Sequence, residues 1–193
     1  MQTDSLFYRL FQTAPALLFE LIGEVNAQSS AYTFRSVELK QTAFRIDGVF
    51  LPDPRTADSP VYFVEVQFQR DRQLYSRLFS EVMIFLRQNP TVQHWRVVAI
   101  FGDRTCEPRA VGAHESLLSL PEVQRLYLNE LAEEPSESLE LGLVRLIVAP
   151  TDQAIARAQQ LFSQVGERPS RLSALAIIEL LETIVVYKFP QLS

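Results

Sequence analysis

The stretch VYFVEVQFQ, residues 61–69, is the clearest strand in the chain, because aromatic and β-branched residues fill it. Side chains alternate across a strand, so residues two positions apart share a face. One face is wholly apolar and is predicted to be core; it consists of Tyr62, Val64, Val66 and Phe68. The other face changes from apolar to polar along the strand; it consists of Val61, Phe63, Glu65, Gln67 and Gln69. We therefore expect a central strand that presents a carboxylate and an amide on the same face.

The segments on both sides of this strand predict an α/β core. Residues 31–40 and 43–51 indicate two earlier strands, and the proline-rich segment 51–60 indicates a loop. Residues 72–88 have apolar side chains at helical spacing. The run WRVVAIF, residues 95–101, is apolar throughout, which is typical of a strand buried on both faces of an α/β sheet.

The two ends of the chain predict helices. An opening helical region begins at Asp4 or Ser5 and ends near Gly23. A short strand is expected at 123–128, and helices are expected near 136–148, 152–165 and 170–187.

The order of these elements predicts an α/β fold with a mixed central sheet flanked by helices. We expect a core domain over residues 1–130 and a helical C-terminal extension over residues 131–193, packed on the core. Because the final FPQLS resembles a helix cap with no helix after it, we also expect the natural chain to continue past Ser193.

Composition limits where the protein works. The chain has one cysteine, Cys106, so it can form no internal disulfide, which fits a reducing compartment. No stretch reaches the ~18 continuous apolar residues of a membrane helix. The N-terminus has no basic run followed by an apolar core, as a signal peptide would. We expect a cytoplasmic protein that does not bind membranes.

The net charge of −5 is not typical of a strong nucleic-acid binder, but the charge is unevenly distributed. Residues 35–109 carry 11 Lys and Arg against 9 Asp and Glu. This balance permits a local phosphate-contacting face. Four arginines are candidates, although a solvated charged face is the ordinary role of such positions; they are Arg70, Arg72, Arg77 and Arg87.

A second acid is expected close to Glu65. Asp47 lies on the preceding predicted strand, and an antiparallel pairing would bring it beside Glu65. Gly48, directly after it, indicates a bulge or a close backbone approach. Two converging carboxylates repel each other unless a cation neutralises them, and oxygen ligands favour Mg²⁺ or Mn²⁺. Such a site could activate water against a phosphodiester.

An ion pair is the alternative explanation for this buried carboxylate, because buried charges are either paired or bound to metal. Three cationic residues could pair with Glu65; they are Lys40, Arg45 and Arg77. In that case Asp47 would serve only in a turn.

The same residues carry a family resemblance. RIDGVFLP at 45–52, VYFVEVQFQ at 61–69 and LYSRLFSEVMIFLRQ at 74–88 resemble the recombination-promoting nuclease and putative-transposase group of the PD-(D/E)xK superfamily. SVELK at 36–40, WRVVAIF and the ending LLETIVVYKFPQLS at 180–193 resemble an uncharacterised, mostly cyanobacterial branch of that group.

The resemblance implies a restriction-endonuclease-like αβββαβ core and Mg²⁺- or Mn²⁺-dependent hydrolysis of DNA, in recombination or mobile-element processes. By position, Asp47 and Glu65 would bind the metal, and Gln67 takes the place of the superfamily lysine. Glu20, with Glu24 behind it, is the candidate acid on the first helix, where it would add a metal ligand. Arg77 and Gln73 would contact phosphate. A homodimer would suit cleavage of both strands.

Gln67 is the main departure from the superfamily pattern, because a neutral amide cannot supply the positive charge of lysine. The rival hypothesis is therefore a catalytically weak or inactive nuclease-fold module that binds nucleic acid or protein. The remaining chemically distinctive residues are interpreted as structural or incidental; they are His94, Trp95, Cys106 and His114.

Overall fold

The computed structural model describes residues 2–24, 31–38, 45–53, 59–109, 111–131, 138–168 and 170–189. Within these ranges, the side chains of residues 2–4, 36–38 and 45–47 lie outside the described part. The chain divides into two compact units. We call Asn26–Tyr127 the sheet unit, and Met1–Val25 together with Leu128–Ser193 the helical unit.

The sheet unit contains a five-stranded mixed sheet whose spatial order, β1-β2-β3-β4-β5, follows the sequence. The strands are β1 (Tyr32–Glu38), β2 (Arg45–Pro52), β3 (Val61–Gln67), β4 (Trp95–Phe101) and β5 (Val123–Tyr127). The first three strands pair antiparallel, whereas β3, β4 and β5 run parallel. The predicted central strand is confirmed, because β3 lies in the middle of the sheet.

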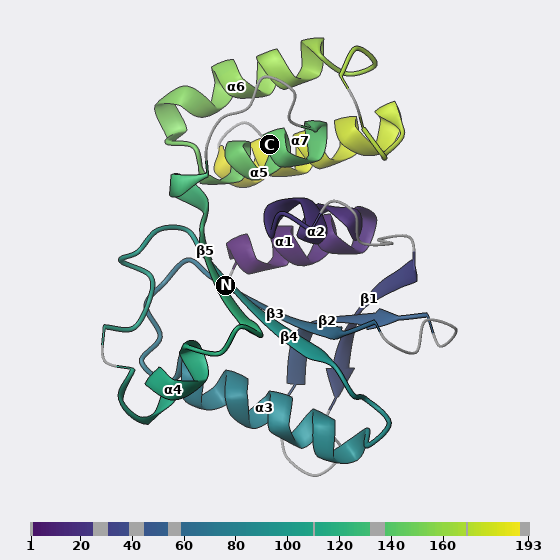
Figure 1. Cartoon of the computed structure of the whole chain (residues 1–193). Helices are drawn as coiled ribbons and strands as arrows, with labels where there is room; N and C mark the ends of the chain where they lie inside the picture. The colour runs from purple at the N-terminus through teal and green to yellow at the C-terminus, as the bar shows by residue number, and fades with distance from the viewer. Residues whose placement is uncertain are drawn as a thin grey trace. The chain divides into compact units, whose positions relative to one another are not determined.

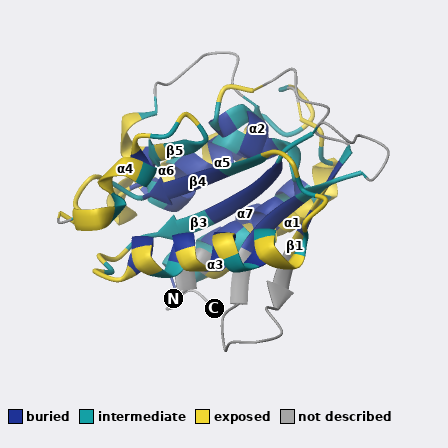
Figure 2. Cartoon of the chain, turned by 60° about the horizontal axis from the view of Figure 1, so that its bottom comes forward, coloured by how far each residue is buried: buried dark blue, intermediate teal, exposed yellow. Residues whose placement is uncertain are grey.

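One helix of the sheet unit, α3 (Leu74–Gln88), connects β3 to the parallel strand β4 and packs on the sheet (Figure 1). A helical crossover is the usual way to join two parallel strands. Buried and exposed positions alternate along α3 with helical spacing, so one side faces the sheet and the other faces solvent (Figure 2).

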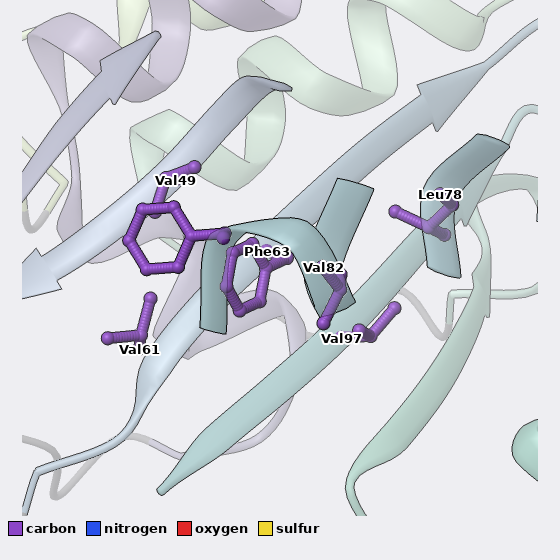
Figure 3. Packing of buried hydrophobic residues seen from close by; sticks show 7 residues of the cluster. Val49, Val61, Phe63, Leu78, Val82 and Val97 are labelled. Atoms are coloured by element: carbon purple, nitrogen blue, oxygen red, sulfur yellow. The ribbon is translucent and has the colours of Figure 1, made fainter. Parts of the chain in front are cut away.

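The core under α3 is made by valines of the strands and apolar side chains of the helix (Figure 3). Phe63 of β3 is fully buried there and meets Phe85 edge-on, with ring centroids 5.1 Å apart. Burying a side chain of this size stabilises a fold by about 1.5–3 kcal/mol. The cluster consists of Val49, Val61, Phe63, Leu78, Val82, Phe85 and Val97.

A second cluster continues the core toward the carboxyl ends of the parallel strands. It includes the short helix α4 (Glu115–Leu118), which follows the 3₁₀ turn η2 (Gly112–His114). The cluster consists of Leu74, Tyr75, Phe79, Ala99, Phe101, Cys106 and Leu118. The two clusters together fix α3 along its whole length.

The helical unit collects both ends of the chain. Its helices are α1 (Gln2–Thr13), α2 (Ala16–Leu21), α5 (Leu139–Val148), α6 (Thr151–Ser163) and α7 (Ala174–Lys188). The 3₁₀ turn η3 (Leu128–Glu130) comes before α5. The helix α5 is apolar almost all round and is the most deeply buried of them. It contacts α2, α6 and α7, which is why it has no polar face.

The predicted fold class is confirmed: this is an α/β protein with a five-stranded mixed sheet and C-terminal helices. Serines cap α5 and α7, since Ser138 accepts from the N–H of Leu141 and Ser173 from that of Ala176. The grouping of the N-terminus differs from the expected division at residue 130. Residues 1–25 belong with the C-terminal helices, because α1 contacts α7 and α2 contacts α5.

Candidate active site

Glu65 is the carboxylate around which the candidate site is built. It lies near the carboxyl end of β3, where burial falls from the fully buried Phe63 to intermediate exposure. Its strand neighbour in the register is the small residue Ala99 of β4, on the face that α3 covers. The side chain of Glu65 is 16% exposed, so the carboxylate is recessed but reachable from solvent. In α/β sheets, ligands bind at this carboxyl edge of parallel strands.

One oxygen of Glu65 receives two hydrogen bonds from nearby cationic and amide groups. Nη2 of Arg77 donates to Oε1 over 2.8 Å, and Nε2 of Gln67 donates to the same Oε1 over 2.8 Å. The ion pair considered as the alternative is therefore present, with Arg77 as the partner. The other two alternatives, Lys40 and the side chain of Arg45, lie outside the described residues.

Arg77 divides its guanidinium between two acids. Nη1 donates to Oδ2 of Asp71 over 2.6 Å while Nη2 holds Glu65. Burial by itself would lower the pKa of Arg77, but the hydrogen bonds and charges of Asp71 and Glu65 outweigh it and raise the pKa. This forked geometry suits a guanidinium and would not be reproduced by lysine.

The turn before α3 holds Asp71 in place. Oδ1 of Asp71 accepts the backbone N–H of Gln73 over 2.9 Å, and this bond contributes most to lowering the pKa of Asp71. Burial opposes the shift, and Arg77 reinforces it. Gln73 is the N-cap residue of α3, and its side chain is exposed. Its contact with phosphate stays a prediction.

Gly48 brings β2 close to the site, and both features predicted for it are confirmed. A Cβ at this position would lie 2.7 Å from the carbonyl oxygen of Val64, so only glycine fits. The pairing of β1 with β2 also shifts register here, because Arg35 pairs with Val49 but Val37 pairs with Ile46. The extra residue in β2 is a β-bulge.

Asp47 lies in β2 directly before this glycine, and its side chain lies outside the described part. Since β2 and β3 are antiparallel and Gly48 abuts Val64, the backbone of Asp47 runs beside residues 64–65. The register of β2 with β3 covers Val49 and Phe50, and the juxtaposition of Asp47 and Glu65 stays a prediction. Its use as a metal site stays a prediction.

Glu20, the predicted third metal ligand, lies in the helical unit. Its Oε2 accepts the hydroxyl of Ser138 over 2.7 Å, and its Oε1 accepts the backbone N–H of Ser138 over 3.4 Å. Glu20 therefore supports the N-terminus of α5 through its capping serine. The role of Glu20 as a metal ligand stays a prediction.

Glu107 centres a second polar cluster that sequence reasoning did not anticipate. Its Oε1 accepts Tyr75 over 2.5 Å and Arg125 over 3.1 Å, and its Oε2 accepts Tyr127. Burial would raise the pKa of Glu107, but the bonds from Tyr127, Tyr75 and Arg125 outweigh it and lower the pKa. No spacing in the sequence could reveal this cluster, because its members come from α3, β5 and the loop after β4.

Glu107 and Glu65 differ in the hydrogen bonds that their carboxylates accept. Burial and hydrogen bonding to Glu107 raise the pKa of Tyr127 to about 12, so Tyr127 stays a neutral donor. Glu107 is fully engaged by three donors and acts as a structural clamp. Glu65 accepts the bonds from Gln67 and Arg77 on one oxygen, Oε1, at the carboxyl end of the central strand, which is why it is the better candidate for chemistry.

Among the side chains that the structure describes, no three His, Cys, Asp or Glu gather closely enough to hold a metal ion. Asp47 is not one of those described side chains.

Three residues interpreted as structural or incidental lie against apolar side chains. His114 stacks on Phe79 with centroids 6.1 Å apart, Cys106 is buried in the core, and Trp95 packs against the core under α3.

The fold and the site define an α/β protein with a polar cluster at the carboxyl edge of its parallel strands. The chain belongs to the family described as protein of unknown function (DUF2887), which its residues 3–193 match. No curated protein and no solved structure matches it. No helix within the described ranges is both long and apolar enough to cross a membrane.

Proposed function

We propose that this protein is a cytoplasmic, metal-dependent endonuclease that hydrolyses DNA phosphodiester bonds. The observation that carries the proposal is the recessed carboxylate of Glu65 at the carboxyl edge of the central strand, held between Gln67 and Arg77. The resemblance of the β2 and β3 sequences to the PD-(D/E)xK nuclease group supports it. So does the order of elements, helices followed by three strands, a helix and a strand.

The donor set fits a hard divalent cation. Asp47 and Glu65 offer carboxylate oxygens from adjacent strands, and such ligands suit Mg²⁺ or Mn²⁺. When bound, the cation would supply Lewis acidity at a phosphodiester. A cation bound to Oε1 of Glu65 would replace one of its two donors, and Arg77 is the donor that has a second acid, Asp71, to retain it.

Four residues then have defined roles in the proposed reaction. Asp47 and Glu65 would hold the cation, and Gln67 would orient a water through its amide. Arg77 would supply the positive charge that Gln67 lacks, because its side chain is 36% exposed and is held beside the site by Asp71. In this proposal the missing lysine is replaced from the helix rather than from the strand.

The rival function is a binding module without catalysis, and one observation favours it. The ion pair between Arg77 and Glu65 already neutralises the carboxylate, so the acid has a structural use without metal. The two functions differ in a measurable way, because only the nuclease requires Glu65 for a metal-dependent activity.

The decisive experiment is cleavage of supercoiled plasmid in Mn²⁺ or Mg²⁺. We expect nicking or linearisation by the wild type and none by Glu65→Gln, which keeps the size of the side chain and removes its charge. Glu115→Gln is the matched control, since Glu115 is an exposed acid of the same unit on α4.

Loss of cleavage in Glu65→Gln alone would support the nuclease. A folded wild type that leaves the plasmid intact would favour the binding module. Equal cleavage by wild type and Glu65→Gln would place the activity elsewhere.

A further inference from the structure

Exposed arginines collect in two loops at the carboxyl edge of the parallel strands. The loop after β3 carries Arg70 and Arg72, and the loop after β4 carries Arg104 and Arg109. All four side chains are exposed. We call these four residues the arginine edge. They lie at the same edge of the sheet as Glu65 and Gln67, which end β3.

The two loops are joined to each other rather than hanging free. Nε and Nη2 of Arg70 donate to the carbonyl oxygen of Thr105 over 3.0 and 2.6 Å. The backbone N–H of Gly102 donates to the carbonyl oxygen of Gln67 over 3.1 Å. Asp103 closes a turn by accepting the N–H of Thr105 over 2.6 Å. The loop after β4 therefore has a defined position relative to the strand that carries Glu65.

Glu107 anchors the other half of the loop after β4. Its bonds from Tyr75 and Tyr127 tie the loop to α3 and β5 at once. Arg104 stacks over the ring of Tyr127, with its guanidinium carbon 4.1 Å from the centroid. Stacking of this kind orients the plane of a guanidinium group. The loop thus presents an oriented arginine at little entropic cost.

Glu65 and Glu107 lie deeper than the arginines around them, whereas the side chain of Asp71, between Arg70 and Arg72, is 33% exposed. The carboxylates of Glu65 and Glu107 are 16% and 14% exposed, whereas the guanidinium of Arg125 is 41% exposed. The four side chains of the arginine edge are exposed as well. A ligand approaching this edge would meet four exposed guanidinium groups beside one partly exposed carboxylate, Asp71, although the whole chain has a net charge of −5.

We propose that the arginine edge binds the phosphodiester backbone of duplex DNA, with Arg70 and Arg104 as its positioning residues. This inference rests on the proposed function, because it takes DNA as the ligand and places its backbone beside Glu65. Guanidinium groups recognise phosphate through paired N–H donors. Backbone contacts of this kind set the register of a duplex and carry no sequence preference.

The test is the salt dependence of binding to a fluorescein-labelled DNA duplex, measured by anisotropy in EDTA so that no cleavage occurs. Each phosphate contact contributes about 0.9 to the slope of log affinity against log salt. We expect Arg104→Ala and Arg70→Ala each to reduce the slope by about that amount and to weaken binding. Arg9→Ala is the matched control, an exposed arginine of α1 in the helical unit.

Arg70→Ala also removes the bond to Thr105, so Arg104→Ala, which leaves that bond in place, carries the test if Arg70→Ala fails to fold. An unchanged slope in Arg104→Ala, or an equal change of slope in Arg9→Ala, would overturn the inference. So would tighter binding of an RNA duplex of the same sequence, or no binding of DNA by the wild type.

The outcome separates this inference from the nuclease proposal. DNA binding that depends on Arg104 without any plasmid cleavage would retain the arginine edge and remove the nuclease. Cleavage that requires Glu65, with DNA binding unchanged in Arg104→Ala, would retain the nuclease and remove the arginine edge.

Discussion

Arg77 and Glu65 lie twelve positions apart, on α3 and β3, and their Nη2 and Oε1 atoms are 2.8 Å apart. The contact joins the helix to the central strand at the open edge of the sheet. Glu65 therefore contributes an ion pair to the fold in addition to its proposed role as a metal ligand.

Replacing Arg77 should destabilise the sheet unit modestly. Because the pair is partly exposed, we expect Arg77→Ala to lower the free energy of unfolding by about 1 kcal/mol. Arg77→Lys should recover only part of it, since lysine cannot hold Asp71 and Glu65 at once. Urea unfolding of a double-mutant cycle with Glu65→Gln measures the coupling. A coupling energy of zero would mean that the contact does not stabilise the fold.

Divalent metal should raise the melting temperature of the wild type, because a ligand that binds only the folded state stabilises it. Glu65→Ala should abolish the Mn²⁺-induced shift. Arg77→Ala should enlarge it, since Arg77 competes for Oε1 of Glu65 and repels a cation. Scanning fluorimetry with and without EDTA measures each shift. An equal shift in wild type and Glu65→Ala would contradict the proposed metal site.

Gly48→Ala should be costly, because the new Cβ would meet the backbone oxygen of Val64 at 2.7 Å. Overpacking of this kind costs about 1–3 kcal/mol. Gly102→Ala provides the comparison: its Cβ would meet only the ring of Phe68, at 2.8 Å, which is a side chain that can move. Chemical denaturation of both variants should therefore show the larger loss in Gly48→Ala. The reverse order would mean that β2 shifts to accommodate the methyl group.

Acidification should remove the stability that Glu107 contributes. Its folded-state pKa lies below the ordinary value of 4.5, because the bonds it accepts outweigh burial. The contribution is thus complete above pH 4.5 and is lost as the pH falls through the folded-state pKa. We expect Glu107→Gln to be less stable than wild type at neutral pH. The difference should shrink in acid, as unfolding free energies at a series of pH values would measure. A difference independent of pH would contradict this account.

Substitution of Glu20 can distinguish its contact with the capping residue Ser138 from a role as a metal ligand. Glu20→Ala removes both bonds to Ser138, and we expect a loss of about 1 kcal/mol, as for a weakened helix cap. Glu179→Ala, an exposed acid on α7 of the same unit, is the control. If Glu20 is also a metal ligand, as the resemblance implies, Glu20→Ala should reduce the Mn²⁺-induced shift in melting temperature. An undiminished shift would leave only the cap.

Local sequence was sufficient to predict the elements of the sheet. The run 95–101 and the strand around Glu65 were recognisable because burial on one or both faces imposes a visible pattern on side chains. The amphipathic spacing of α3 was equally clear. Gly48 also signalled its own role, because close backbone approach demands the absence of a Cβ.

Contacts between distant segments could not be predicted, since each member looks ordinary in its own segment. Arg77 was one of three cations that could pair with Glu65, and only packing of α3 on the sheet selected it. Glu107 and Tyr127 carried no signal until β5 was placed beside β4.

The sequence by itself determined the alternation of strands and helices, and with it the acid at the end of the central strand, because backbone periodicity and side-chain polarity act locally. Only the tertiary structure decided that Arg77 holds Glu65, that Arg70 reaches Thr105, and that the first helices join the last ones. These are long-range contacts, chosen by shape and charge complementarity between surfaces that form only when the chain has folded.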